Sequence, residues 1–181
     1  MALMLMRHLP PAIAPGTCYG MTDLALAEGH EAALAAVIAK LPTLDGVITS
    51  PLRRCRILAD SIAAQAGLTA SPDARLREMD FGAWEGRAWD DIPRAELDAW
   101  AADFLHARPH GGESVAQLQA RTRLALAQHG ARPGLHLIVT HAGVIKAALA
   151  TGPRAEDWPP SLAFGEIVTI SPPIGDFHHA G

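Results

Sequence analysis

The sequence has little cysteine, lysine or aromatic character, and it has no hydrophobic run that could cross a membrane. Its longest apolar stretch, residues 32–39, is much shorter than the ~20 residues that a membrane helix needs. Cys18 and Cys55 form no C-x-x-C motif and cannot build a disulfide framework, so a reducing compartment is expected. The first residues lack the cationic segment and the cleavage site of a signal peptide. These absences predict a soluble protein of the cytoplasm.

Excess positive charge is also absent, because the formal net charge is −4. No basic field therefore attracts nucleic acid or an anionic membrane, and neither is expected as a partner. Only Lys40 and Lys146 are lysines, which leaves 13 arginines among the 15 basic residues (15 − 2). The arginine fork suits oxyanions, but this bias runs through the whole chain. A single arginine is therefore informative only inside a motif.

The chain does have enough apolar residues to build a core of its own. Its 181 residues are 49% hydrophobic and 19% charged, a composition typical of globular rather than disordered proteins. A chain of this length is expected to fold as one domain, residues 1–181. No internal repeat, linker or low-complexity segment divides it.

Short apolar runs alternate along the chain with longer segments rich in alanine and leucine. The runs predict strands at residues 2–6, 46–49, 135–140 and 166–170. The longer segments predict helices at residues 25–41, 50–66, 89–107, 113–130 and 142–150. Ser50 and Pro51 suit the N-cap and first position of the second helix, and residues 76–86 are expected to be an irregular loop. The alternation predicts an α/β fold, a three-layer α/β/α sandwich around a mostly parallel sheet.

Polar residues follow three of the predicted strands. Arg7-His8 follows the first strand, Ser50 follows the second, and His141 follows the strongest one. Alone, Arg7-His8 is an ordinary loop pair and His141 a structural helix cap. Two histidines at equivalent strand ends are harder to ascribe to coincidence, because ligands of such sheets bind at the carboxyl ends of the strands. Arg54, one turn into a helix, can reach the same edge, although a solvated basic helix face explains its neighbours equally well.

Five motifs in one order resemble the histidine phosphatase superfamily, which includes the cofactor-dependent phosphoglycerate mutases. They are Arg7-His8, S-x-L-x-R at residues 50–54, L-x-E at 76–78 with G-x-W-E-G at 82–86, G-G-E-S at 111–114, and H-A-G-V-I at 141–145. The resemblance spans residues 5 to about 170. It implies a phosphoglycerate mutase-like fold and phosphoryl transfer on a small phosphorylated substrate.

Residues 10–23 add a second, narrower resemblance. Their A-P-G-x-C-Y-G stretch, followed by Thr22-Asp23, looks like the α-ribazole phosphatase branch of the cobalamin pathway. The chain departs from that pattern at Leu9, where the family carries glycine or a small hydroxyl residue. A leucine side chain cannot help to hold a phosphate. The narrower resemblance implies α-ribazole 5′-phosphate as the substrate.

The resemblance also implies a role for each matched polar residue. His8 is the nucleophile that becomes a phosphohistidine, which divides one difficult step into two. Arg7, Arg54 and His141 bind the oxygens of the transferring phosphoryl group. Glu78 protonates the leaving alcohol and then activates water, a role that needs a higher pKa than the ordinary value of about 4.3.

Further contacts to substrate or phosphate are expected from Ala142, Tyr19, Thr22 and Glu113. Ala142 lies at a helix start, where backbone N–H groups bind anions. No metal and no cofactor is expected, because cationic donors are numerous and the histidines lack zinc-site spacing. The adjacent His178 and His179 are expected to be tail residues. The sequence leaves the assembly open between a monomer and a homodimer.

Residues 87–114 are expected to form a cap over the site. Trp84, just before this range, and Trp89 and Trp100 within it are expected to form the cap together with the acidic stretch 90–103. Ordinary helix packing is an equal alternative for each tryptophan. Whether these three side chains contact substrate stays open at this point.

Three other functions compete with α-ribazole phosphate hydrolysis. A broad-specificity sugar or nucleotide phosphatase of the same superfamily explains all five motifs. A mutase is less favoured, because the phosphoglycerate mutases carry an inserted segment that this chain lacks. A regulatory or binding homologue is suggested by Leu9 alone, whereas a decayed site would be expected to have lost some of its five polar groups.

Overall fold

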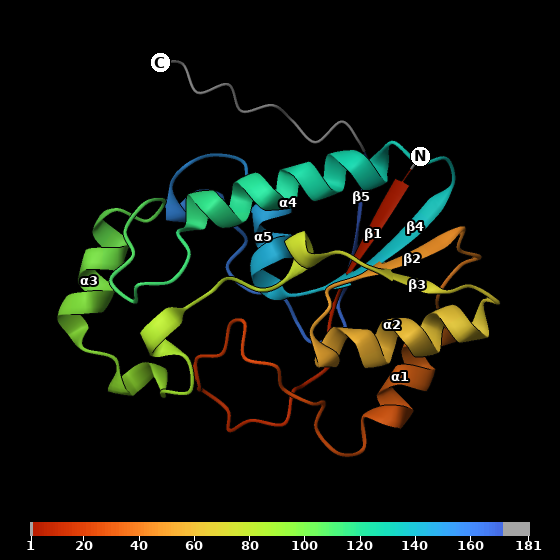
Figure 1. Cartoon of the computed structure of the whole chain (residues 1–181), viewed down its shortest axis with the longest axis horizontal. Coiled ribbons are helices and arrows are strands. Elements are labelled where there is room, and N and C mark those ends of the chain that lie inside the picture. The colour runs from red at the N-terminus through yellow and green to blue at the C-terminus, as the bar shows by residue number, and fades with distance from the viewer. Residues whose placement is uncertain (1, 172–181) are drawn as a thin grey trace.

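Residues 2–171, the part of the chain that this computed structural model describes, form a five-stranded sheet between two layers of helices (Figure 1). The strand order is β3 (Ala70–Pro72), β2 (Gly46–Thr49), β4 (Leu135–Thr140), β1 (Ala2–Arg7) and β5 (Ile167–Ile170). All neighbours run parallel except β5, which is antiparallel to β1. The expected mostly parallel α/β architecture is confirmed.

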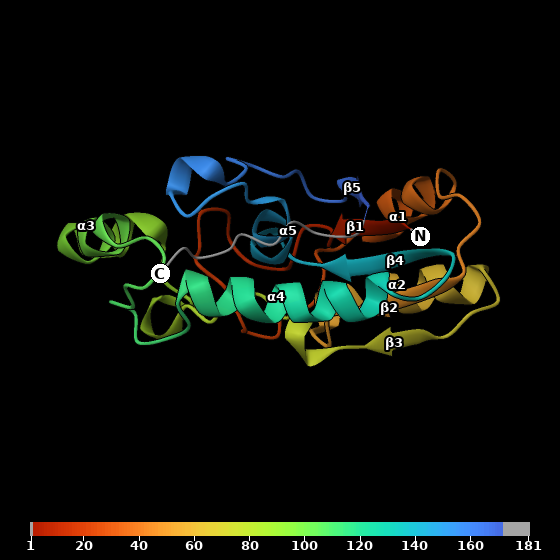
Figure 2. The same ribbon diagram turned by 90° about the horizontal axis from the view of Figure 1, so that it is seen from above.

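The helices cover both faces of this sheet. Helices α1 (His30–Ile38) and α2 (Arg53–Gln65) lie on one face, and α4 (Val115–Gly130) and α5 (Ala142–Leu149) lie on the other (Figures 1 and 2). Helix α3 (Arg94–Ala102) stands away from the sheet at one end of the molecule.

Each central strand therefore buries side chains on both sides. In β1, Leu5 packs with the α4 and α5 side, and Met6 packs with the α1 and α2 side. Ile138 and Val139 of β4 alternate in the same way. Because successive side chains of a strand point to opposite faces, a strand covered on both faces needs a continuous apolar run. That requirement explains the uninterrupted apolar run from which the strand was predicted.

Register brings the strand ends together. Arg7 of β1 lies opposite Thr140 of β4, and the next backbone N–H, that of His8, donates to the Thr140 carbonyl at 3.0 Å. The Ser50 backbone N–H donates to the Val139 carbonyl at 2.9 Å, just after β2. The first residues beyond three parallel strands are thus fixed at one edge of the sheet.

The predicted helix boundaries need three corrections. The first helix begins at His30 rather than at residue 25, because Gly29 takes a left-handed conformation with φ of 76° and Leu26 bridges to Pro11. The segment predicted as one helix from 89 to 107 is a short 3-10 turn, Trp89–Asp91, followed by α3. Pro93 separates the two, because the residue before a proline is disfavoured in helical conformation.

The third correction concerns Ser50, which is not the N-cap of α2. Helix α2 begins at Arg53 with Leu52 as its N-cap, and the first-turn N–H of Arg53 donates to Asp23 Oδ1 at 2.7 Å. Asp23, from a loop 30 residues earlier in the chain, thus accepts from the first turn of the helix. The Ser50 Oγ accepts from the Leu52 N–H at 3.3 Å and lies 2.7 Å from His141 Nε2 at the sheet edge. The short edge strand β3 was not predicted, since A-S-P offers no strand pattern.

A third, smaller apolar cluster is formed by Cys18, Trp84 and Ile92, with Trp89 and Trp100 packed against it. Among residues 2–171, no helix is both long and apolar enough to cross a membrane.

Candidate active site

His8 lies directly after β1 and is 1% exposed. Its Nδ1 is 2.7 Å from the carbonyl oxygen of Leu9. A carbonyl can only accept, so Nδ1 carries the ring proton and Nε2 keeps its lone pair. Burial lowers the pKa of His8 to about 3; the Leu9 hydrogen bond opposes this shift, and the charges of Arg54 and Arg7 add to it. The ring is therefore neutral and nucleophilic at pH 7.

Leu9 takes part in this arrangement through its backbone. Its carbonyl orients His8, while its side chain is buried in the apolar layer beneath α1 and α2. The residue that departs from the family pattern thus fixes the tautomer of the neighbouring histidine without any side-chain hydroxyl.

His141 is the second histidine of the sheet edge. Its ring centroid is 5.2 Å from that of His8, and the two rings meet edge to face at 64°. Its Nε2 is 2.7 Å from Ser50 Oγ and 3.5 Å from Cys55 Sγ. Complete burial lowers the pKa of His141 well below its ordinary value, and the charge of Arg54 lowers it further. The pair of histidines is therefore uncharged.

Two guanidinium groups bring positive charge to these neutral rings. Arg54 is fully buried on α2 and donates to the carbonyls of Thr22 at 2.8 Å and Gly20 at 2.7 Å. Arg7 donates to the carbonyl of Leu162. The Nε–H groups of Arg7 and Arg54 are buried and have no hydrogen-bond partner among residues 2–171. Because an unsatisfied buried donor is costly, these two N–H groups favour an anionic ligand.

Glu78 lies in the irregular segment that follows the 3-10 turn Ala74–Leu76. Its Oε1 accepts from the backbone N–H of Met79 at 2.9 Å, and its Oε2 accepts from that of Gly143 at 3.1 Å. Gly143 is the second residue of α5, where helix N–H groups lack partners within the helix. The hydrogen bond from Gly143 thus holds the Glu78 carboxylate next to the chain two residues after His141.

A cavity of about 790 Å³ connects His8, Arg7 and Glu78, which is within the size range of small-molecule sites. Arg7 lines it, whereas Arg54 and His141 are not among its lining residues. The rest of its wall is mainly aromatic: Tyr19, Phe81, Trp89, Trp100, Phe104 and Trp158. Lys146 and Glu156 add a positive and a negative group to its lining. The arrangement combines a neutral nucleophile, a cationic cradle, a carboxyl group and an apolar space for a leaving group.

The comparison with known families agrees with this geometry. A sequence profile of the histidine phosphatase superfamily, branch 1, matches residues 3–163. The chain belongs to the histidine phosphatase superfamily. The expectation drawn from the five motifs is confirmed at this level.

The relatives include both phosphatases and mutases. Glucosyl-3-phosphoglycerate phosphatase of Mycobacterium tuberculosis is 34% identical over 180 residues, covering 87% of this chain and 78% of that protein. The probable phosphoglycerate mutase GpmB of Klebsiella pneumoniae is 35% identical over 114 residues, covering 58% of this chain. This chain spans about half the length of that mutase-named relative, because the match covers 51% of it.

Solved structures of the superfamily have the same fold. A mycobacterial glucosyl-3-phosphoglycerate phosphatase in complex with VO3 matches with a TM-score of 0.80 at 29% identity, covering 94% of this chain and 92% of that one. A phosphoglycerate mutase from Thermus thermophilus matches with a TM-score of 0.74 at 30% identity, covering 96% and 94%. The expected phosphoglycerate mutase-like fold is confirmed.

The residues expected to make further contacts are divided between the cavity and its surroundings. Tyr19 and Ala142 line the cavity, and burial raises the pKa of Tyr19, so its hydroxyl keeps its proton. Thr22 does not line it, because its hydroxyl donates to Glu85. Glu113 lies outside it as well, in a bidentate ion pair with Arg121.

The tryptophans of the cap region are divided in the same way. Trp89 and Trp100 line the cavity, whereas Trp84 is fully buried and its indole N–H donates to Glu96 at 2.6 Å. Trp84 thus has the packing role, and contact of Trp89 and Trp100 with substrate stays a prediction. His178 and His179 lie outside the described residues.

The sequence reasoning missed Lys146 and Cys55. Lys146 Nζ donates to the carbonyl of Pro160 at 2.9 Å, and burial lowers its pKa. Its rarity, as one of only two lysines, was the available signal. Cys55 contacts His141 from α2, and nothing in its sequence context distinguishes it from a core cysteine. Within residues 2–171, no group of three or more His, Cys, Asp or Glu side chains is placed to hold a metal ion.

Proposed function

We propose that this protein is a phosphatase that transfers the phosphoryl group of a small phosphate monoester first to His8 and then to water. The observation that carries the proposal is the free Nε2 of a buried, neutral His8 beside the unpaired Nε–H groups of Arg7 and Arg54. Glu78 lines the same cavity as His8, on the side where a leaving alcohol can lie.

In the first step, the Nε2 lone pair of His8 attacks phosphorus and the bond from phosphorus to the ester oxygen breaks. Glu78 gives its proton to that oxygen, and the alcohol leaves. Charge builds on the three equatorial oxygens, where Arg7, Arg54 and an N–H of His141 stabilise it. The Leu9 carbonyl stabilises the positive charge on the phosphorylated ring through Nδ1–H.

In the second step, water attacks the phosphohistidine. The Glu78 carboxylate takes a proton from that water, the N–P bond breaks, and its electron pair returns to Nε2. Free phosphate leaves, and His8 and Glu78 regain their starting protonation states. The protein supplies every group in this cycle, so turnover is expected without a metal or a cofactor.

For the substrate we propose α-ribazole 5′-phosphate. The stretch at residues 10–23 supports this choice, and the aromatic cavity walls suit a planar base on the leaving ribose. A sugar phosphate is the second candidate, favoured by the 34% identity to glucosyl-3-phosphoglycerate phosphatase over most of the chain. Location in the cytoplasm and assembly as a monomer or homodimer stay predictions of the sequence.

Two experiments test this proposal. The first measures kcat/KM with chelator present on α-ribazole 5′-phosphate, nucleotides, sugar phosphates, glucosyl-3-phosphoglycerate and an aryl phosphate. Preference for the first of these supports the substrate, and preference for glucosyl-3-phosphoglycerate overturns it. Absence of all turnover favours a binding homologue, and turnover that needs metal contradicts the mechanism.

The second experiment quenches the enzyme with ³²P-labelled substrate. An acid-labile, base-stable phosphoprotein is expected, and it should be absent from His8→Ala. Turnover of substrate without any trapped phosphoprotein would favour direct attack by water.

A further inference from the structure

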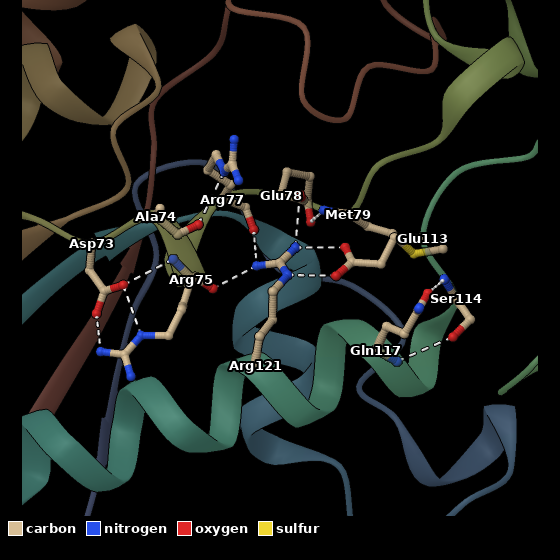
Figure 3. Close-up of polar contacts among 10 residues, drawn as sticks. All are labelled: Asp73, Ala74, Arg75, Arg77, Glu78, Met79, Glu113, Ser114, Gln117 and Arg121. Atoms are coloured by element: carbon tan, nitrogen blue, oxygen red, sulfur yellow. Dashed lines mark hydrogen bonds and ion pairs between the residues drawn. The ribbon is translucent and has the colours of Figure 1, made fainter.

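Arg121 of α4 makes an unusual set of contacts with the segment that carries Glu78. Its Nη1 donates to the carbonyls of Arg75 and Arg77, each at 2.6 Å. Its Nη2 donates to the carbonyl of Glu78 at 3.0 Å. Figure 3 shows this guanidinium at the centre of the segment, with the three carbonyls directed toward it. One side chain thus satisfies three backbone acceptors within four residues.

Glu113 holds the guanidinium in place from the other side. Its two carboxylate oxygens accept from Arg121 Nε at 2.7 Å and Nη2 at 2.8 Å, the paired geometry in which arginine and carboxylate fit best (Figure 3). Glu113 directly precedes Ser114, whose capping box with Gln117 fixes the start of α4. The pair therefore joins the segment at residues 75–78 to a rigid helix.

This connection matters because residues 77–81 belong to no strand or long helix. The carbonyls of Asp80 and Phe81 accept from backbone N–H groups, at 2.8 Å and 3.0 Å, whereas those of Arg77 and Glu78 accept from Arg121. The backbone course at Glu78 therefore depends on this side-chain donor. The Glu78 carboxylate has only two hydrogen bonds, to Met79 N–H and Gly143 N–H. A shift of the backbone at Glu78 would move its carboxyl group relative to His8, and proton transfer tolerates little misplacement.

We propose that Arg121, held by Glu113, is a positioning residue that fixes the backbone of the proton donor Glu78. This inference rests on the proposed function, in which Glu78 protonates the leaving alcohol. In this inference Glu113 supports catalysis by holding Arg121, without contacting the substrate. Lysine cannot replace Arg121, because a single ammonium group cannot pair with the Glu113 carboxylate and reach three carbonyls at once.

The test compares wild type with Arg121→Gln and Arg121→Lys on aryl and alkyl phosphates of increasing leaving-group pKa. General acid catalysis contributes about 10²- to 10⁴-fold, and a misplaced acid loses part of it. We expect kcat/KM for alkyl phosphates to fall by about 10- to 100-fold in both variants, while that for a nitrophenyl phosphate changes less than about 3-fold. A general loss of folded structure would lower kcat/KM for the alkyl phosphates and for the nitrophenyl phosphate to the same extent.

Arg75→Gln is the matched control. Arg75 belongs to the same segment, and its guanidinium pairs with Asp73 (Figure 3) rather than with the backbone near Glu78. It also donates to Gln128 Oε1 at 2.7 Å. This variant should keep the wild-type dependence on the leaving group. If Arg121→Gln is too unstable to purify, Glu113→Gln gives the same readout, because it removes the charge of the partner and keeps its volume.

The outcomes separate this inference from the proposed function. A leaving-group effect in Glu78→Gln and in Arg121→Gln supports both the acid role of Glu78 and the positioning role of Arg121, provided that the two effects are non-additive in the double variant. An effect in Glu78→Gln with none in the Arg121 and Glu113 variants overturns the positioning role alone. No effect in Glu78→Gln overturns the acid role of Glu78 and with it the positioning role of Arg121. The transfer to His8 is tested separately, by whether the phosphohistidine is trapped.

Discussion

The carboxylate of Glu78 accepts the backbone N–H of Gly143, so the proposed proton donor is attached to the first turn of the helix that begins after His141. This contact crosses from an irregular segment to a helix fixed at the end of β4. It makes the position of Glu78 depend on two supports, Gly143 at its side chain and Arg121 at its backbone.

Gly143→Ala tests the side-chain support. A Cβ built on Gly143 would overlap Oε1 of Glu78, so the carboxylate must move. We expect kcat for an alkyl phosphate to fall by about 10-fold or more, since misplaced catalytic groups cost on the order of 10²-fold. Thermal unfolding should show little loss of stability, because alanine favours helix over glycine by about 1 kcal/mol. In the Glu78→Gln background the same substitution should have no additional effect on kcat, and a full additional loss there would contradict the explanation.

Glu78→Gln tests the acid itself. Glutamine keeps the shape, but its single amide oxygen can accept from only one of the two backbone N–H groups, Met79 or Gly143, and it cannot transfer a proton. Activity on alkyl phosphates should fall by about 10²- to 10⁴-fold, with a much smaller loss on nitrophenyl phosphate, whose leaving group needs no proton. Steady-state kinetics on the two substrates decide the matter, and equal losses on both would remove Glu78 from this role.

The sequence was sufficient for four strands of the sheet and for the polar edge, and insufficient for the edge strand β3 and for the supports of Glu78. Strand ends are local: an apolar run followed by Arg7-His8 or by His141 identifies both the strand and its carboxyl end. The Arg121 contacts and the Asp23 cap of α2 join residues distant in sequence, so no periodicity reveals them. The G-G-E-S motif identified Glu113 but not its partner. Its ion pair with Arg121 could not be read from the sequence, so a contact with phosphate was expected instead.

Arg54 and Arg56 provide a test of how much a single arginine matters. They lie on the same helix, but Arg54 is fully buried with a free Nε–H, while Arg56 forms an exposed ion pair with Asp60. Removing one preorganised donor to transition-state charge costs about 10²- to 10³-fold. We expect Arg54→Gln to lower kcat/KM by at least that amount and Arg56→Gln to change it less than about 2-fold, as expected for exposed pairs worth at most about 1 kcal/mol. Comparable losses would mean that the overall field, not the pocket, binds the phosphate.

The lowered pKa of His8 predicts how stability depends on pH in the ligand-free protein. In the unfolded chain His8 binds a proton below its ordinary pKa of 6.5, whereas in the folded protein it does so only near pH 3. Between these values the unfolded state takes up more protons, so stability falls as the pH falls, by at most about 1.4 kcal/mol per pH unit. The slope fades above pH 6.5, where the unfolded histidine loses its proton as well.

His8→Gln should therefore flatten the stability curve between pH 6.5 and 4. The neighbouring charges of Arg54 and Arg7 and the neutral His141 stay in place in this variant, so the change in slope reports His8 itself. Urea unfolding at pH 4.5, 5.5, 6.5 and 7.5 measures it, and the curves of variant and wild type should converge in slope above pH 6.5. Parallel curves across the acidic range would show that His8 titrates normally in the folded protein. In that case the ring would be partly charged at pH 6 and would lose nucleophilicity there. A ring with the lowered pKa would stay neutral and nucleophilic at the same pH.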